Sequence, residues 1–138
     1  MCSRYSPVSI ELISLEIRGY LNKLVAKYPS IQEIWLIGSR VNRSAEAKDW
    51  DFIVFADEDA LAALEKDADF DMPDIDLLIV YDGDRFKKPR GNKSGSLTEW
   101  GWRIIDPMNG KAQYQGSKRA GSEINIQCCQ AIRVWQLD

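Results

Sequence analysis

Residues 33–55, EIWLIGSRVNRSAEAKDWDFIVF, are the stretch that decides the fold. The stretch opens with the apolar run 33–37 and closes with the aromatic and β-branched run 50–55, and both runs are typical of buried strands. Gly38 and Ser39 end the first run, and a polar loop follows them. The sequence therefore predicts two neighbouring strands joined through a glycine turn and a loop.

Helical and strand patterns flank this stretch on both sides. A helix is expected from Pro7 to Tyr28, because apolar residues recur there at helical spacing and Pro29 then stops the pattern. Residues 57–67 predict a short helix with acidic residues in its first turn, which suits the helix dipole. Residues 74–81, DIDLLIVY, predict a third strand.

The remainder of the chain gives weaker signals. Residues 82–96 are rich in Gly, Lys, Arg, Pro and Ser and predict a loop. Strands are expected at 97–105 and 111–115, on either side of the turn sequence PMNG at 107–110. The tail from Ser122 fits a strand or a helix. Together the patterns predict an α/β (α+β) fold with a mixed β-sheet and helices packed mainly on one face.

Composition limits the range of functions. The chain has 138 residues, of which 45% are hydrophobic, so it can form one domain with a real core. Its net charge of −3 argues against a general nucleic-acid coat protein. It contains no histidine, which excludes Ser-His-Asp and Cys-His catalysis and histidine zinc sites. Carboxylates, lysines, hydroxyls or a bound metal must carry any chemistry.

Cysteine usage and hydropathy bear on location. The chain has three cysteines, Cys2, Cys128 and Cys129, and an odd count with an adjacent pair predicts no disulfide framework and a cytoplasmic protein. The adjacent pair is expected to be buried, inert thiols. The sequence has no signal-peptide pattern and no run of ~20 apolar residues. We therefore expect a soluble protein with no membrane partner.

Aspartates stand at the start of two predicted strands. Asp49 and Asp51 are two residues apart, so their side chains point to one face at roughly 6–7 Å. Such a pair raises the pKa of at least one carboxyl unless cations neutralise it, and Mg²⁺ prefers oxygen ligands of this kind. If the two strands are neighbours, Asp76 joins the pair, and three carboxylates can hold two metals for displacement at phosphorus. Asp74 shares the face of Asp76 and is its rival, but apolar residues flank Asp76 on both sides.

The glycine turn is a candidate phosphate site. Gly38 lets the backbone approach a ligand closely, and successive N–H groups there can bind an anion. The Ser39 hydroxyl adds a donor, and the Arg40 guanidinium adds a cationic fork. Phosphate-binding groups so close to metal-binding carboxylates suggest a nucleoside triphosphate held between them.

These motifs resemble those of the polymerase-β-like nucleotidyltransferases, including their minimal members. The family pattern is a hydrophobic residue, Gly-Ser, a short loop and Asp-x-Asp, read here at 37–39 and 49–51 with a third acid at Asp76. The resemblance covers about residues 7–81 of a single domain, 1–138, and leaves 97–138 as a β-rich C-terminal extension. Many small members have a second glycine in the loop after Gly-Ser, and residues 41–48 have none.

The resemblance implies a metal-dependent transfer of a nucleoside monophosphate from a nucleoside triphosphate to an acceptor, with release of pyrophosphate. Gly38, Ser39 and Arg40 would then bind the triphosphate, with ATP the expected donor. Asp49 and Asp51 would hold two Mg²⁺ or Mn²⁺ ions, and Asp76 would ligate the catalytic one.

Several partners and functions stay open. Small family members often act as antitoxins beside a helical HEPN-type ribonuclease toxin, so the acceptor could be a partner protein, an RNA, a second copy of the chain or a small molecule. A catalytically inactive module that binds a nucleotide or a partner is an alternative, and an antibiotic nucleotidyltransferase, supported by the acidic run 67–74, is another. The basic run 87–93 is a solvated surface or a contact for triphosphate or RNA. Trp100 and Trp102 are core residues or a base-stacking platform.

Overall fold

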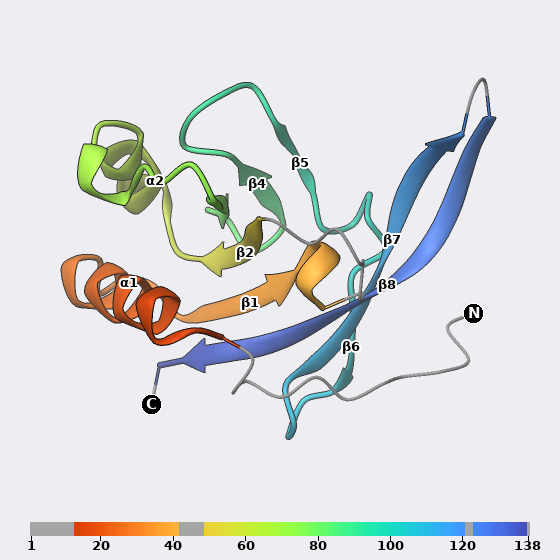
Figure 1. The fold of residues 1–138 in the computed structure, drawn as a ribbon, viewed down its shortest axis with the longest axis horizontal. Coiled ribbons are helices and arrows are strands. Elements are labelled where there is room, and N and C mark those ends of the chain that lie inside the picture. The colour runs from red at the N-terminus through yellow and green to blue at the C-terminus, as the bar shows by residue number, and fades with distance from the viewer. Residues whose placement is uncertain (1–12, 42–48, 121–122, 138) are drawn as a thin grey trace.

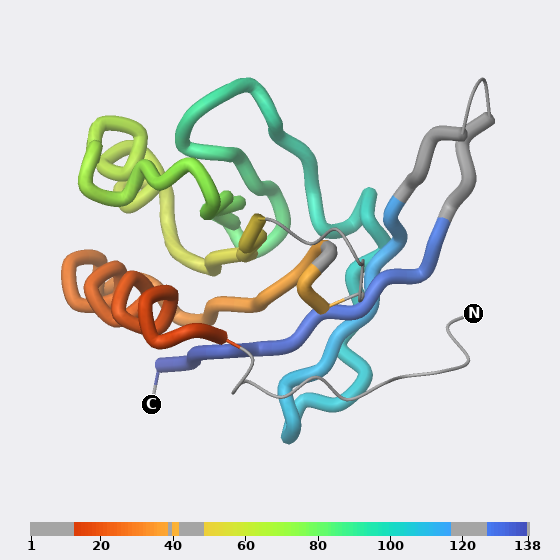
Figure 2. The backbone as a smooth tube through the Cα atoms, viewed as in Figure 1, coloured from red at the N-terminus to blue at the C-terminus, as the bar shows by residue number. Residues whose placement is uncertain are grey.

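The computed structural model describes residues 13–41, 49–120 and 123–137, which form two α-helices, two short 3-10 turns and one eight-stranded sheet (Figures 1 and 2). In chain order the elements are α1 (Leu15–Lys27), β1 (Glu33–Ile37), η2 (Gly38–Arg40), β2 (Trp50–Phe55), α2 (Glu58–Glu65), η3 (Ala68–Phe70), β3 (Ile75–Val80), β4 (Arg85–Lys87), β5 (Ser94–Ser96), β6 (Arg103–Asp106), β7 (Lys111–Ala120) and β8 (Glu123–Gln136).

The sheet is mixed. Its strand order is β5-β4-β3-β2-β1-β8-β7-β6, in which only β2 and β3 run parallel. The strands expected at 33–37, 50–55 and 74–81 are confirmed as β1, β2 and β3, and the helix expected at 57–67 is confirmed as α2. The α+β class and the mixed sheet are therefore confirmed.

Both helices cover the same face of the sheet. Buried side chains of α1 and α2 form one core cluster with alternate residues of the central strands, among them Phe52 in β2 and Leu77 in β3. The prediction that the helices pack mainly on one face is confirmed. The predicted start of the first helix at Pro7 is wrong, because Ser14 has extended backbone angles and its side chain accepts the Ile17 N–H as an N-cap. Residues 1–12 lie outside the described part.

The opposite face carries a second core without helices. Side chains from β1, β2, β3, β4, β7 and β8 meet there, and Trp100 and Trp102 pack against them. Trp102 meets Trp35 edge-on at 5.2 Å between ring centroids, and Trp100 stacks on Tyr114 at 5.3 Å. The residues after β5 thus cover this face of the sheet.

Residues 82–96, expected to be a loop, instead form the β4–β5 hairpin. The Asp82 carboxylate accepts the backbone N–H groups of Asp84 and Arg85, which fixes the turn before β4. The Phe86 side chain is almost completely buried and anchors the hairpin to the second core. Two three-residue strands with one buried anchor are too short to leave a visible pattern in the sequence.

The C-terminal part also differs from expectation. The strand expected at 97–105 is confined to β6, because turns occupy residues 97–101. The expected turn at 107–110 is confirmed between β6 and β7, and the ambiguous tail is the long strand β8. Figure 1 shows β8 running beside both β1 and β7, so the tail occupies the middle of the sheet.

The cysteines depart from the prediction as well. Cys128 is exposed and disulfide-bonded, and Cys129 is a half-buried free thiol. The prediction that the adjacent pair is two buried thiols is therefore wrong. Across the described residues, neither helix has the length and apolar character needed to cross a membrane.

Candidate functional site

Asp51 and Asp76 lie directly opposite each other on the two parallel strands. The register of β2 and β3 pairs these two residues. Their strand neighbours Phe52 and Leu77 point into the helical core, so alternation turns both aspartates to the other face of the sheet. The condition set by the sequence, that the two acid-bearing strands be neighbours, is fulfilled.

The two carboxyl groups interact strongly. Burial raises the pKa of Asp51 to about 6, with further contributions from the Asp76 charge, a hydrogen bond between the two side chains and the Asp49 charge; Lys93 opposes the shift. The Lys88 ammonium lies 2.8 Å from Asp76 Oδ1 and balances that carboxylate. Asp76 is thus an ionised carboxylate balanced by a lysine. Burial and acidic neighbours disfavour the ionised form of Asp51 beside it.

Gly38 packs directly against Asp51. The residue has a φ of +77°, and a Cβ built on it would overlap Asp51 Oδ2 and lie 3.2 Å from Cγ. Its N–H donates to the Tyr114 hydroxyl at 3.1 Å, which ties the turn to β7. Only glycine combines this backbone conformation with this close approach. The turn therefore brings backbone groups to the edge of the carboxyl pair.

A cleft of about 590 Å³ opens over the pair. Its walls come from the second core and from the β4–β5 hairpin, and its lining residues are Ile37, Gly38, Asp51, Asp76, Leu78, Lys88, Lys93, Glu99, Trp100, Tyr114, Gln115, Gly116 and Cys129. The volume falls in the range of pockets that hold small molecules and cofactors. Acidic, basic and aromatic side chains therefore meet in one concave space.

The structure does not bring every predicted residue into the cleft. Asp49 and Asp74 are exposed and are not among its lining residues, although the Asp49 charge acts on Asp51. The Arg40 guanidinium lies 4.3 Å from the Trp50 ring, and its Nε donates to the Asp49 carbonyl. The Ser39 side chain lies outside the described part of the structure.

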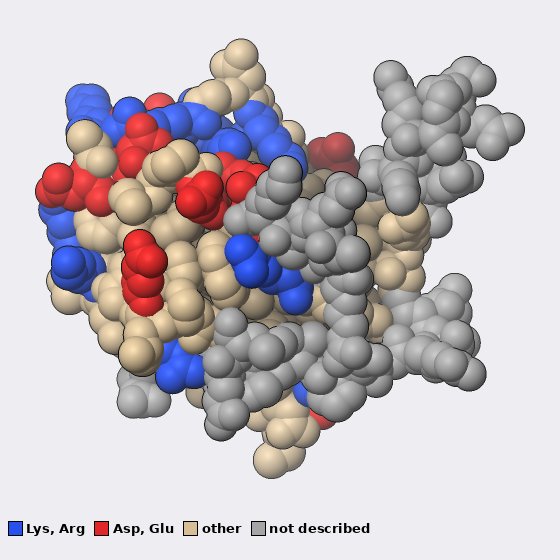
Figure 3. Space-filling view, viewed as in Figure 1, with Lys and Arg blue, Asp and Glu red and all other residues tan. Residues whose placement is uncertain are grey.

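The basic run 87–93 reaches the site from the β4–β5 hairpin. Figure 3 shows blue side chains gathered along the region of this hairpin, with red ones beside them. Lys88 and Lys93 line the cleft, and the Lys88 N–H donates to the Lys93 carbonyl, which closes the hairpin loop. Lys87 and Arg90 instead pair with Glu65 and Asp71, away from the cleft. Only part of the run therefore serves the site.

A smaller pocket of about 220 Å³ lies next to the cleft. Both cavities are lined by Asp76 and Lys88, so their ion pair stands between them. The acidic run 67–74, considered for a cationic substrate, makes local contacts: Asp67 pairs with Lys27, and Asp71 pairs with Arg90. Neither aspartate lines the larger cleft.

The carboxylates of the cleft are candidate ligands for a divalent metal. Within residues 13–41, 49–120 and 123–137 no group of three or more His, Cys, Asp or Glu side chains converges as a ready metal cage. Asp51 and Asp76 nevertheless lie opposite each other and supply two carboxylates as oxygen donors. A cation between them would offset the cost of keeping Asp51 ionised in its half-buried position beside other acids. Mg²⁺ is commonly bound through one or two carboxylates plus substrate phosphates, so the pair fits that mode.

Sequence reasoning missed some residues of the cleft. Tyr114 and Gln115 lie far along the chain in β7 and reach the site only because β7 and β8 continue the sheet beyond β1. The sequence shows Lys88 as part of a basic run, but it does not predict the ion pair of Lys88 with Asp76. No local pattern predicts such contacts, because they depend on strand order.

No family model, no curated protein and no solved structure matches this chain. The geometry and chemistry of the cleft itself are therefore the guide to the function.

The raised pKa of Asp51 predicts a stability that falls as pH rises. In the unfolded chain the pKa of this carboxyl is its ordinary value of 3.8, whereas in the folded chain the pKa is about 6. Below pH 3.8 the carboxyl is protonated in both states and does not affect the free energy of folding. Between pH 3.8 and about 6 it destabilises the folded state increasingly, and above pH 6 the destabilisation has its full size. After allowance for solvent screening the penalty at pH 7.5 is about 1–2 kcal/mol.

We expect Asp51→Asn to raise the melting temperature by several degrees at pH 7.5 and to have almost no effect near pH 4. Thermal unfolding without divalent metal, followed by circular dichroism across this pH range, measures the difference. Asp74→Asn is the matched control, because Asp74 is exposed at the same end of β3. Equal melting temperatures of Asp51→Asn and wild type at pH 7.5 would contradict the assignment.

Proposed function

We propose that this protein is a metal-dependent nucleotidyltransferase that transfers a nucleoside monophosphate from a nucleoside triphosphate to an acceptor. The observation that carries the proposal is the pairing of Asp51 with Asp76 on parallel strands, beneath a cleft and against the Gly38 turn. Carboxylates in register provide metal ligands, and a glycine turn with positive φ provides a place for phosphate.

Each side chain has a defined task in this proposal. Asp51 and Asp76 hold the metal, with Asp49 close enough to contribute charge. A divalent ion bound there would supply Lewis-acid stabilisation of charge on the transferring phosphoryl group. Lys88 and Lys93 bind the phosphate oxygens, and Gly38 lets the triphosphate approach the backbone. The acceptor hydroxyl binds beside Asp76, whose carboxylate orients it.

The energetic cost at Asp51 supports a ligand-binding role. A half-buried carboxyl with a raised pKa lowers stability at neutral pH, and strongly perturbed acids of this kind cluster at functional sites. A purely structural position could hold asparagine or an apolar residue without that cost. Binding of a cation during function gives a physical reason for a carboxylate there.

The proposal is tested first by thermal stability with ligands. ATP, GTP, CTP and UTP are added singly at millimolar concentration, each with Mg²⁺, with Mn²⁺ and with EDTA. A nucleotide present at about 100 times its Kd stabilises the folded state by ~2.7 kcal/mol, or several degrees. We expect a metal-dependent shift, strongest with ATP, that the double variant Asp49→Ala/Asp51→Ala loses. The absence of a shift with every metal–nucleotide pair would contradict the proposal.

One observation favours a second candidate, a non-catalytic nucleotide-binding module of the same architecture. Lys88 already neutralises Asp76, so the cleft can hold anionic phosphates without a metal. Pyrophosphate release separates the two candidates when acceptors of several kinds are supplied. The non-catalytic module would be stabilised by nucleotide in EDTA and would release no pyrophosphate with protein, RNA or small-molecule acceptors.

A further inference from the structure

The cleft contains an aromatic surface that the proposed transfer chemistry does not use. Trp100 is half-buried and lines the cleft. One side of its indole stacks on Tyr114, with 5.3 Å between ring centroids and 22° between ring planes, and Phe86 meets it edge-on at 4.8 Å. The ring is thus fixed by aromatic neighbours rather than free to rotate.

Lys93, from the β4–β5 loop, contacts the Trp100 ring. The Lys93 ammonium lies over the indole, 5.6 Å from its centroid, as a cation–π contact. Lys93 is exposed and belongs to a short loop, so this contact is worth little and is easily exchanged. The same ammonium is close enough to Asp51 for its charge to act on that carboxyl. The indole and the carboxyl pair therefore lie within the reach of one lysine side chain.

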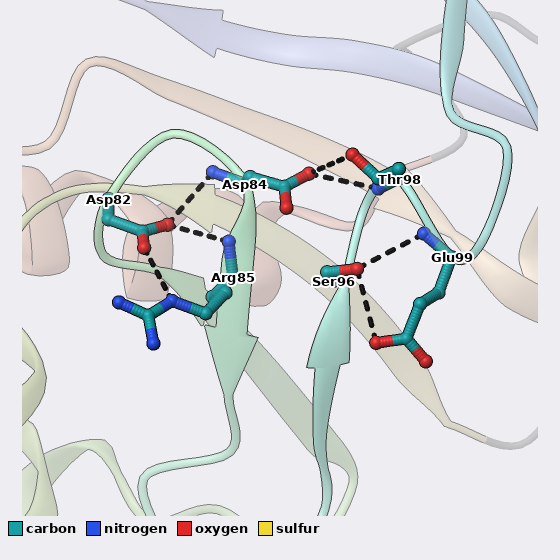
Figure 4. Close-up of polar contacts among 6 residues, drawn as sticks. All are labelled: Asp82, Asp84, Arg85, Ser96, Thr98 and Glu99. Carbon is teal, nitrogen blue, oxygen red and sulfur yellow. Dashed lines mark hydrogen bonds and ion pairs between the residues drawn. The ribbon is translucent and has the colours of Figure 1, made fainter.

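The backbone around Trp100 is braced from two sides. The Thr98 N–H and hydroxyl both donate to Asp84 Oδ1, at 2.9 and 2.7 Å, and the Glu99 N–H donates to Ser96 Oγ (Figure 4). The Trp100 carbonyl accepts the Gln115 N–H of β7 at 2.7 Å. A side chain held on such a frame is suited to be a fixed binding surface.

We propose that the indole of Trp100 is the stacking platform for the nucleobase of the bound nucleotide, with Lys93 moving from the ring to the phosphates when the nucleotide binds. The inference rests on the proposed function for the identity of the ligand as a nucleotide. Stacking on an aromatic side chain accepts any base, because every base has a π-face. Lys88 and Lys93 line the cleft beside the indole, so they favour a ligand that carries negative charge next to its ring.

The test compares ATP with inorganic triphosphate, which has the phosphates and no base. Dissociation constants of both are measured by calorimetry with Mg²⁺ for wild type, Trp100→Leu and Trp100→Phe. Loss of base stacking weakens ATP binding in Trp100→Leu by about ten- to a hundred-fold and leaves triphosphate binding unchanged. Trp100→Phe retains most of the ATP affinity, because it keeps an aromatic face.

Trp102→Phe is the matched control, because Trp102 packs against Trp35, Phe55 and Tyr114 and does not itself line the cleft, and phenylalanine keeps an aromatic ring against them. It leaves both affinities unchanged. Lys93→Ala is a second probe, which removes the ammonium and leaves the indole in place: it weakens triphosphate binding several-fold and does not weaken adenosine binding. Circular dichroism establishes that each variant is folded.

The outcomes separate this inference from the proposed function. Equal losses of ATP and triphosphate in Trp100→Leu, or no loss of either, overturn the stacking platform, as does a wild type that binds neither ligand. Selective loss of ATP affinity in a protein that releases no pyrophosphate leaves the platform standing and contradicts the transferase. If Trp100→Leu leaves a metal-dependent release of pyrophosphate unchanged, the transferase is supported and the stacking platform is contradicted.

Discussion

Replacing Asp76 with asparagine is expected to lower pyrophosphate release about a thousand-fold. The substitution removes one of two negatively charged oxygen donors in register, and the loss of a metal contact costs several kcal/mol of transition-state stabilisation. The amide also breaks the ion pair with Lys88, so the lysine remains in the cleft as an uncompensated cation. Initial rates of pyrophosphate release with saturating ATP and Mg²⁺ measure the effect.

Asp74→Asn is the control for this prediction. Asp74 lies just before β3, two residues from Asp76, is exposed and does not line the cleft, so its replacement is expected to change the rate by less than about two-fold. A large loss in Asp74→Asn with little loss in Asp76→Asn would reverse the assignment of the third carboxylate. Similar rates of pyrophosphate release in wild type and both variants would show that the Asp51–Asp76 pair has no part in the reaction.

Gly38→Ala is expected to destabilise the fold by about 2–4 kcal/mol and to abolish metal-dependent nucleotide binding. A left-handed backbone costs a non-glycine residue roughly 1–2 kcal/mol, and overpacking adds a similar amount. The new methyl group would overlap Asp51 Oδ2, so the carboxylate must turn away from its position beside Asp76. Chemical denaturation measures the first effect, and the thermal shift with ATP and metal measures the second.

Gly19→Ala provides a control with the opposite sign. Gly19 lies inside α1, and a Cβ there would meet nothing within 4 Å. Alanine is the better helix former by up to about 1 kcal/mol, so this variant is expected to be more stable and to bind nucleotide like wild type. A Gly38→Ala protein with unchanged stability and binding would mean that the turn does not approach Asp51 as described.

The sequence was a good guide to the central strands. The runs that form β1, β2 and β3 have unbroken apolar patterns, and the Asp-x-Asp motif and Asp76 were placed correctly at two strand starts. Their direct pairing was foreseen only as a condition, because register depends on strand order and no local pattern encodes it. The same limit applies to the Gly38 turn, whose bond to Tyr114 spans 76 residues.

The walls of the cleft were less predictable for a different reason. The β4 and β5 strands have three residues each, which is too short for alternation to be recognised, so the sequence predicts one loop over 82–96 and not the hairpin whose loop brings Lys88 and Lys93 to the cleft. Trp100 was expected in a strand and lies in a turn, where Asp84 and β7 hold the backbone. The prediction that Arg40 binds phosphate stays untested; in the structure its guanidinium lies over the Trp50 ring.

The place of β8 in the middle of the sheet has a consequence for biosynthesis. Because β8 pairs with both β1 and β7, neither neighbour has its full set of backbone partners until residue 136 has left the ribosome. During translation the nascent chain therefore exposes the open edge of β1, a surface of the kind that recruits chaperones or aggregates. Assembly of the cleft is therefore coupled to synthesis of β8, which joins Tyr114 and Gln115 of β7 to the rest of the sheet.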